Sequence, residues 1–289
     1  MAHTWQAGRR IGLGLTLAAA VLALPAHAQE EKVLNIYNWS DYIGDDTIKN
    51  FEKETGIKVR YDVFDNNEIL NAKLVAGKSG YDIVVPTAQW ARLQIDAGLL
   101  RKLDKSKLTN LGNLDPNLPA KLSKIDPNND YLVDWLWGYT TVGINVNKVK
   151  AALGAMPLPE NAWDLVFDPK YAAKLKSCGV SFLDSPSEVL PAALMFDTMA
   201  IPADAPHPNN AHLFINYILR PQVHASLSNK VFYANPNPAS IKYVRKDIGE
   251  NKAIFLPDAD KQRMAAPEAT TADIRRLMTR IYTKFKTGL

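Results

Sequence analysis

The chain has 289 residues, 47% of them hydrophobic, which is enough for one large or two modest domains with a packed core. Its 34 basic and 30 acidic residues give a net charge of +4, and the basic residues are spread along the sequence, so neither nucleic acid nor an anionic membrane surface is an expected partner. The single cysteine, Cys178, cannot form an internal disulfide and is expected to be buried apolar filler.

The first 28 residues have the three parts of a cleavable export signal. Two arginines precede an apolar run over residues 11–24, and an Ala-x-Ala pattern ends at Ala28. The apolar run is shorter than the roughly 20 residues that a bilayer span needs. We therefore expect residues 1–28 to be a signal peptide and the mature chain to begin at Gln29.

Strands alternate with helices in the first part of the mature chain, which favours a parallel sheet covered on both sides. Ligands of such sheets bind at the carboxyl ends of the strands. Trp39, Asp41 and Thr87 follow two of these strands and are expected to line the same crevice. The predicted order is strand 33–37, helix 46–56, strand 57–64, helix 67–76, strand 81–86 and helix 88–97.

The remaining sequence has a less regular pattern. Residues 101–130 are polar and loop-rich, without internal repeats. After them the pattern predicts an aromatic strand within 131–147, helices at 162–167 and 171–175 with a further segment at 179–184, a strand and loop at 195–205, and helices at 211–219 and 271–286.

Patterns typical of catalysis and metal binding are absent from the sequence. It has no phosphate-binding loop and no arrangement of nucleophile, base and orienting group. His207, His212 and His224 lack the spacing of a metal-binding helix. We therefore expect no enzyme activity, no catalytic residue, no metal and no cofactor.

Several aromatic and acidic residues together fit the needs of a small diamine. Its ammonium groups need carboxylates, because a charge removed from water costs several kcal/mol unless it is paired. Aromatic faces contact methylenes and attract a nearby ammonium by about 0.5 to 2 kcal/mol. The pattern alone favours a simpler interpretation, in which Trp39 is a core aromatic and Ser40 or Asp41 caps a turn. The residues that would meet the diamine's needs are Trp39, Asp41, Tyr42, Glu188, Asp197 and Tyr233.

Longer segments of the mature chain resemble the periplasmic putrescine-binding proteins of polyamine ATP-binding-cassette (ABC) importers. The resemblance covers almost all of the mature chain and is carried by "VLNIYNWSDYI", "NFEKETGIKVRYDVFDNNEIL", "YDIVVPTAQW", "LKSCGVSFLDSPSEV", "FDTMAIPADA", "NYILRPQV" and "VFYANPNP". It implies a type II periplasmic binding fold of the α/β class, in which two lobes joined by hinge strands close on the ligand. It also implies a monomer in the periplasm that binds a polyamine, with putrescine the expected one, and delivers it to an inner-membrane ABC permease.

The same resemblance implies the positions of the polyamine-binding residues. Those of the first loop match the family's Trp, Ser, Asp and Tyr, and the hydroxyl residue after "VVP" is threonine here, where serine is common. The others come from the segments "LD-x-P-x-E-V", "FD-x-x-A-x-P" and "YANPN". The eight residues are Trp39, Ser40, Asp41, Tyr42, Thr87, Glu188, Asp197 and Tyr233.

The chain departs from the family where Leu194 is followed directly by Met195. Family members continue there through a long segment with a G-W-x-G-D block that contacts the ligand, so this chain is shorter by roughly 70 residues, about half a typical domain. The expected division is a first lobe at 29–138 and 195–238, a truncated second lobe at 139–194, and C-terminal helices at 239–289 that pack on the second lobe.

The shortened second lobe has a consequence for function. About 50 residues between the crossing strand and Asp197 are a marginal size for a lobe, so we expect the second lobe to be incomplete and one side of the crevice to be open. Polyamine affinity should then be much reduced or absent. The alternative to a working importer component is a non-binding remnant or interaction protein, derived from that family by internal deletion.

Overall fold

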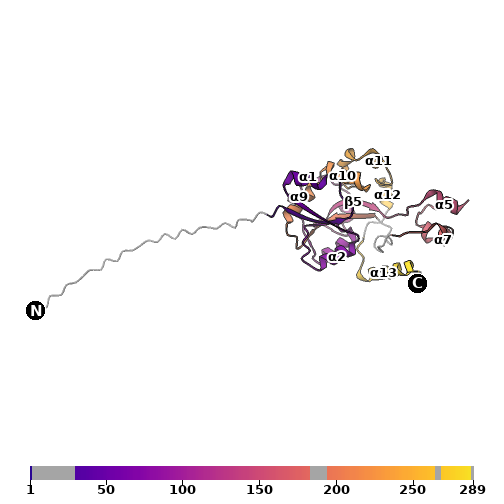
Figure 1. Cartoon of the computed structure of the whole chain (residues 1–289), viewed down its shortest axis with the longest axis horizontal. Coiled ribbons are helices and arrows are strands. Elements are labelled where there is room, and N and C mark those ends of the chain that lie inside the picture. The colour runs from indigo at the N-terminus through magenta and orange to yellow at the C-terminus, as the bar shows by residue number, and fades with distance from the viewer. Residues whose placement is uncertain (2–29, 183–193, 264–267, 288–289) are drawn as a thin grey trace.

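A computed structural model describes residue 1 and residues 30–182, 194–263 and 268–287, and Figure 1 shows the arrangement of the elements. The strands are β1 (Val33–Trp39), β2 (Lys58–Phe64), β3 (Ile83–Val84), β4 (Leu100–Arg101), β5 (Val133–Tyr139), β6 (Leu194–Met199) and β7 (Ile201–Pro202). The α-helices are α1 (Thr47–Thr55), α2 (Asn67–Val75), α3 (Ala88–Asp96), α4 (Leu118–Leu122), α5 (Val146–Leu153), α6 (Asp164–Phe167), α7 (Pro169–Leu175), α9 (Pro208–Ile218), α10 (Pro221–Val231), α11 (Lys246–Gly249), α12 (Asp258–Arg263) and α13 (Ala272–Thr287). Short 3₁₀ helices lie at Lys105–Lys107, Leu111–Asn113, Lys176–Cys178 and Pro238–Tyr243.

The predicted parallel sheet is confirmed. Its strand order is β2-β1-β3, and β1 pairs with β2 over its whole length, from Val33 opposite Lys58 to Trp39 opposite Phe64. β3 is shorter than the predicted strand over 81–86. Just before β3, the Asn35 N–H of β1 donates to the Asp82 carboxylate at 2.8 Å. A side-chain hydrogen bond therefore takes the place of a backbone bond between β1 and a longer β3.

Both faces of this sheet are covered, as the alternating pattern predicted. One apolar cluster joins residues of β1 to α1 and α9, and includes Leu34, Phe51 and Phe214. The other joins Tyr37 of β1 to α2 and α3. β1 and β3 therefore have no fully exposed residue, whereas β2 at the edge of the sheet exposes residues such as Arg60 and Val63. The carboxyl ends of the strands are the edge where a ligand is expected.

The boundaries of the first two helices follow local signals in the sequence. α1 ends where Gly56 adopts a left-handed conformation at φ 70°, and the Gly56 N–H donates to the Glu52 carbonyl. α2 begins after Asn66, whose side chain accepts the Ile69 N–H at 2.9 Å. These caps fix where β2 begins and where α2 leaves the sheet.

β5 and β6 form an antiparallel pair that leads away from this sheet. Asp134 lies opposite Thr198 and Leu136 opposite Asp197, so Trp135 is the additional residue of a β-bulge. The aromatic strand predicted within 131–147 ends at Tyr139. β7 leaves β6 and pairs with β4.

The helices α5, α6 and α7 form a small group at the far end of the molecule from α1 and α9 (Figure 1). They share an apolar cluster that contains Val149, Leu165 and Tyr171. Residues 179–182 form no strand, and the rest of the 179–184 segment lies outside the described residues. The prediction that Cys178 is buried is wrong, because the thiol lies in a 3₁₀ helix beyond this cluster and is exposed.

Helix α10 was not predicted from the sequence. Its buried face contains His224 and Ser228 beside Ala225 and Leu227, so the apolar period is interrupted by polar residues. His224 donates from Nε2 to the Trp135 carbonyl at 2.6 Å. Burial lowers the pKa of His224 to about 4, so the ring is neutral and suited to this position.

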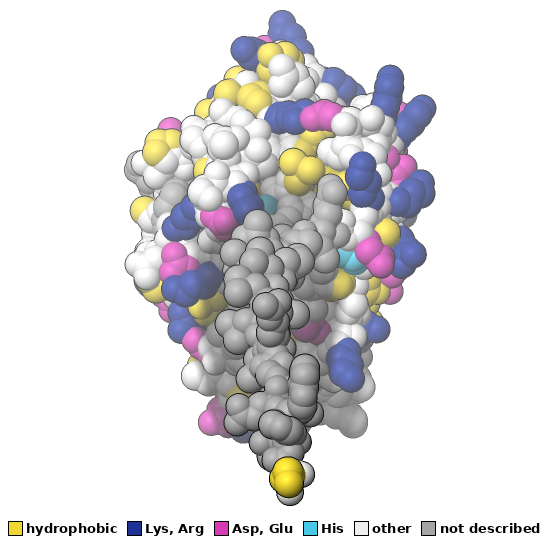
Figure 2. Space-filling view, turned by 90° about the vertical axis from the view of Figure 1, so that its left-hand side faces the viewer, with side chains coloured by type: hydrophobic (Ala, Val, Ile, Leu, Met, Phe, Trp, Pro, Cys, Tyr) yellow, Lys and Arg dark blue, Asp and Glu magenta, His cyan; other side chains and the backbone are white. Residues whose placement is uncertain are grey.

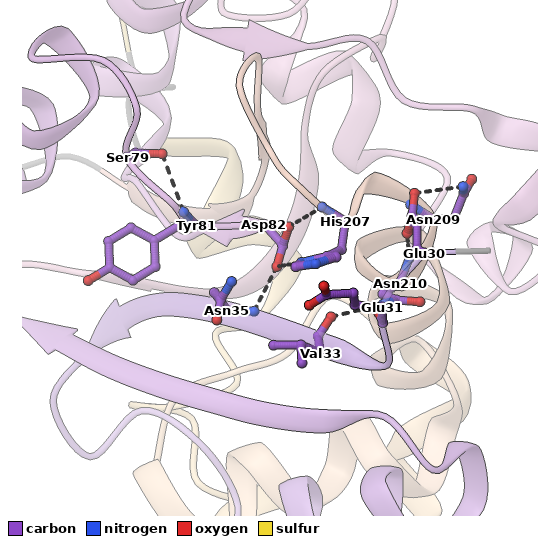
Figure 3. Close-up of polar contacts among 10 residues, drawn as sticks. All are labelled: Glu30, Glu31, Val33, Asn35, Ser79, Tyr81, Asp82, His207, Asn209 and Asn210. Atoms are coloured by element: carbon purple, nitrogen blue, oxygen red, sulfur yellow. Dashed lines mark hydrogen bonds and ion pairs between the residues drawn. The ribbon is translucent and has the colours of Figure 1, made fainter. Parts of the chain in front are cut away.

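A polar network joins the amino end of the sheet to α9 (Figure 3). The buried Asp82 carboxylate accepts the Asn35 N–H at 2.8 Å and the His207 N–H at 2.5 Å. His207 Nδ1 lies 3.1 Å from the same carboxylate. Asp82 thus fixes the loop before α9 against β1 and satisfies groups that burial would otherwise leave unpaired.

Glu30, near the beginning of the predicted mature chain, caps the first turn of α9 (Figure 3). Its carboxylate accepts the Asn209 N–H at 3.0 Å and the Asn210 N–H at 3.1 Å. In addition, the Asn210 side-chain amide donates to the backbone carbonyls of Glu31 and Val33. An anionic side chain at a helix N-terminus is favoured by both the free N–H groups and the helix dipole.

Replacing Glu30 with alanine should destabilise a protein of residues 29–289 by about 1 kcal/mol, the usual cost of a lost helix cap. The thermal midpoint should fall by about 2 to 4 °C, as measured by circular dichroism. Glu31→Ala is the matched control, because Glu31 contributes its backbone carbonyl to the network. Equal midpoints for the two variants would contradict the capping role of Glu30.

The face at the end that carries α1 and α9 has a mixed charge distribution. Figure 2 shows Lys and Arg side chains on this face beside Asp and Glu side chains at several places. The ion pairs Arg220–Glu54 and Lys58–Glu52 are examples of this interspersion. Within the described part of the chain, no helix has the length and apolar character needed to cross a membrane.

Candidate ligand-binding site

A carboxyl group and a phenol meet at the carboxyl edge of the sheet. Tyr42 lies in the loop after β1, and its hydroxyl donates to Asp197 Oδ2 of β6 at 2.7 Å. Both residues are buried, with 7% of each exposed. Burial raises the pKa of Asp197 to about 7, and the hydrogen bond from Tyr42 works against this rise. The group therefore changes charge near neutral pH.

The ring of Tyr233 forms an aromatic wall beside this pair. It meets the Tyr42 ring edge to face, with centroids 5.6 Å apart, and 38% of Tyr233 is exposed. Gly138 of β5 makes room for it, because a Cβ atom at this glycine would lie 2.9 Å from the Tyr233 ring. Any side chain at position 138 would displace the wall.

Thr87 approaches the same edge from the end of β3. Its backbone forms an isolated bridge with Asp197, and its side chain is buried. Asn67 holds it from both sides, because the Asn67 amide donates to Thr87 Oγ1 at 2.9 Å and accepts the Thr87 N–H at 3.1 Å. Asn67 is a positioning residue that the sequence did not reveal.

Trp39 ends β1 and is half-buried. Its indole N–H donates to the Val85 carbonyl at 2.9 Å, and its ring packs against Phe64 with centroids 4.6 Å apart. These contacts are those of a structural aromatic at the edge of the core. They also fix the loop that carries Tyr42.

The two polar residues between Trp39 and Tyr42 are exposed. Ser40 Oγ lies 3.5 Å from Asp65, and Asp41 adopts a left-handed backbone with φ of 53°. The structure thus brings Tyr42, Thr87, Asp197 and Tyr233 together and places Ser40 and Asp41 at the surface of the turn. The remaining predicted residue, Glu188, lies outside the described residues.

A second buried carboxyl lies near Asp197. Asp134 of β5 is 2% exposed, and neither of its carboxyl oxygens has a hydrogen-bond partner among the described residues. Burial, and then the charge of Asp197, raise the pKa of Asp134 well above its ordinary value. An acid inside the apolar run "YLVDWLW" was the available signal in the sequence.

The arrangement is suited to a small organic cation. Asp197 Oδ1 has no hydrogen-bond partner among the described residues, so it can accept a bond from an ammonium group. The Tyr233 ring, 38% of which is exposed, stands beside the Tyr42–Asp197 pair and offers an aromatic surface to methylene groups. Within the described residues, no cluster of acidic, histidine or cysteine side chains could hold a metal ion.

Comparisons with known sequences identify the family of this chain. The family described as bacterial extracellular solute-binding protein matches residues 46–197. The putrescine-binding periplasmic protein PotF of Escherichia coli is 36% identical over 368 residues, covering 98% of each chain. SpuD of Pseudomonas aeruginosa, also a putrescine-binding periplasmic protein, is 36% identical over 359 residues, covering 96% of this chain and 97% of its own. The PotF alignment is longer than the 289 residues of this chain, which is therefore shorter than that relative.

Solved structures show the same fold. A putative spermidine/putrescine ABC transporter protein from Listeria monocytogenes has a TM-score of 0.68 and 24% identity, covering 89% of this chain and 100% of its own. The PotD substrate-binding protein of Streptococcus pneumoniae has a TM-score of 0.64 and 20% identity, covering 88% of this chain and 98% of its own. The chain therefore belongs to the bacterial extracellular solute-binding protein family and has the type II periplasmic binding fold in a shortened form.

Proposed function

We propose that this protein captures putrescine or a related polyamine in the periplasm and delivers it to an ABC permease. The cluster of Tyr42, Asp197 and Tyr233 carries the proposal, because it combines a buried carboxyl with aromatic walls. PotF and SpuD are named for putrescine binding and for the periplasm, which supports the choice of ligand and compartment. In this proposal the chain acts as a monomer after removal of residues 1–28, and it is not an enzyme.

The cluster suggests how one end of a diamine is held. The ammonium donates to Asp197 Oδ1, while Tyr42 keeps the other carboxyl oxygen in place. The methylenes lie against Tyr233, which is held by its packing on Gly138. Binding of the cation favours the ionised form of Asp197, so a proton leaves the site whenever the carboxyl was neutral beforehand. Trp39, Ser40, Asp41, Thr87 and Glu188 complete the proposed site.

The shortened chain limits how completely the ligand can be enclosed. In the described residues, the part between β5 and β6 provides only the small group of α5, α6 and α7. A ligand enclosed on fewer sides keeps more of its water, so each contact contributes less to affinity. This observation also favours the second candidate function, a non-binding remnant or interaction protein derived by internal deletion.

An isothermal titration of residues 29–289 with putrescine and then spermidine tests the proposal. We expect saturable binding that is much weaker than that of PotF measured beside it, because in this proposal the shortened chain encloses the ligand on fewer sides. Circular dichroism first establishes that the protein is folded. A folded protein that binds neither amine would overturn the capture function and leave the remnant interpretation.

A further inference from the structure

The C-terminal helix α13 carries an apolar stripe on its outer surface. Ile274, Leu277, Ile281 and Phe285 are spaced three or four residues apart and therefore lie on one face of the helix. Between 42% and 50% of each of these side chains is exposed. An apolar stripe of this length left in water is uncommon on a monomeric protein and indicates a surface that contacts something else.

Contacts on the neighbouring face fix this helix against the body of the protein. Tyr282 is 4% exposed, and the Arg275 guanidinium lies over the Trp90 ring at 5.6 Å from its centroid. Phe285, at the end of the stripe itself, also contacts the body of the protein, because its ring meets Phe182 edge to face with centroids 4.7 Å apart. Because its inner face is engaged, α13 presents the stripe outward in a defined orientation.

The stripe extends onto a neighbouring element. Phe167 at the end of α6 is 49% exposed, and its ring centroid lies 6.1 Å from that of Phe285. Together, Ile274, Leu277, Ile281, Phe285 and Phe167 form what we call the α13 surface. It is an apolar band that runs along a helix and ends in aromatic rings.

The charged residues of α13 are almost all basic. The helix has one acid, Asp273, whereas its bases are Arg275, Arg276, Arg280, Lys284 and Lys286. Arg280 and Lys284 precede Ile281 and Phe285 by one residue each, so they flank the stripe at the helix surface. This concentration differs from the mixed charges on the face in Figure 2 and from the scattered bases that the whole sequence suggested.

We propose that the α13 surface binds an anionic phospholipid surface, with the stripe in the acyl boundary and the flanking bases at the phosphates. Helices that combine an apolar face with Lys and Arg at its border, and that have low overall hydrophobicity, lie in the membrane interface. Long basic side chains can keep their charge at the headgroups while their methylenes pack on the apolar face. The proposal concerns a different face from the polyamine site and does not depend on ligand capture.

The charge of α13 favours an anionic lipid surface over a second copy of the chain and over nucleic acid. A second copy of the chain would bring two strongly basic helices together, and their like charges would repel each other. Nucleic acid would neutralise the bases and leave the apolar stripe without a partner. An anionic lipid surface satisfies the charge and the stripe together, and each base near it contributes about fivefold in affinity.

Vesicle flotation with residues 29–289 tests the proposal. The probes are vesicles of phosphatidylcholine alone and of phosphatidylcholine with phosphatidylglycerol in equal parts. We expect flotation with the phosphatidylglycerol vesicles only, weakening as salt is added, because exposed charges are screened. Equal flotation with both vesicles, or with neither, would overturn the proposal.

Two double variants separate the contributions of charge and stripe. Arg280→Gln with Lys284→Gln should weaken binding to phosphatidylglycerol vesicles by at least about tenfold. Leu277→Ser with Ile281→Ser should weaken it by at least about tenfold through lost apolar burial. Lys148→Gln with Lys150→Gln on α5 is the matched control, removing the same charge from exposed positions, and should bind as the unaltered chain does.

Sedimentation without lipid tests whether the α13 surface binds a second copy of the chain instead. The unaltered chain should sediment as a monomer at the concentrations used for flotation. A dimer that the serine variant abolishes would assign the α13 surface to a second copy and overturn the lipid proposal. Circular dichroism of both variants should match that of the unaltered chain, because the replaced side chains are largely exposed. Direct binding of the unaltered chain remains decisive even if a variant fails to fold.

Discussion

Asp197→Asn should lower the affinity for putrescine by at least about thirtyfold, while raising the thermal stability of the ligand-free protein at neutral pH. Removing a buried carboxylate from its cationic partner typically costs about 2 to 5 kcal/mol of binding free energy. Stability should change in the opposite direction, because the folded-state pKa of about 7 shows that ionised Asp197 is unfavourable without a ligand. Calorimetric titration measures the first effect, and thermal unfolding measures the second.

The opposite signs distinguish a ligand-binding carboxyl from a structural one. Asp247→Asn is the control, because this carboxylate is exposed, pairs with the nearby Arg245 and is no part of the proposed site. Neither putrescine affinity nor thermal stability should change appreciably in this variant. In the unaltered protein, affinity should rise about tenfold between about pH 6 and pH 8, as the ionised fraction of Asp197 rises through its pKa. Binding that is independent of pH and unaffected by Asp197→Asn would remove this residue from the site.

Asp134→Asn should stabilise the protein at neutral pH by an amount that disappears in acid. The folded-state pKa of Asp134 is raised, so its favourable contribution is complete below about pH 4 and declines as the pH rises toward the folded-state value. The loss is about 1.4 kcal/mol for each pH unit crossed between the unfolded and folded values. Replacing the acid removes this loss, and denaturant unfolding at several pH values measures the difference.

Asp46→Asn provides the matched control for this measurement. Asp46 is exposed before α1 and its side chain makes no capping bond, so the same substitution should change stability by less than about 0.5 kcal/mol. Equal stability of the Asp134 variant and the unaltered protein from pH 4 to pH 8 would show that water or another group compensates the carboxyl, contrary to the prediction.

The first part of the fold could be predicted because its signals are local. The first strands and helices have local signals such as the apolar residues of β1, the Asn66 cap before α2, and Gly56, whose conformation ends α1. Local signals did not predict α10, because the polar residues His224 and Ser228 occupy buried positions on this helix. Their burial depends on contacts with β5 and with distant loops, such as the bond from His224 to the Trp135 carbonyl.

The candidate site shows a similar limit. The end of β1 placed Tyr42 at the sheet edge, and the resemblance supplied Asp197 and Tyr233, which the structure brings together. The contacts that hold these residues could not be predicted from the sequence. One example is the packing of Tyr233 on Gly138, which lies far from it in the sequence. The environment of Asp134 likewise depends on a β-bulge and on its pairing with β6, which a single strand pattern cannot specify.

The position of Glu30 would link the predicted signal-peptide cleavage to the integrity of the fold. Its carboxylate caps α9 from a site only two residues beyond the predicted cleavage point at Ala28. Processing that cuts after Glu30 would leave the N–H groups of Asn209 and Asn210 without this acceptor and the macrodipole of α9 without its counter-charge. If the predicted signal peptide is removed, the cleavage position therefore also decides whether the remaining chain keeps the capped form of this helix.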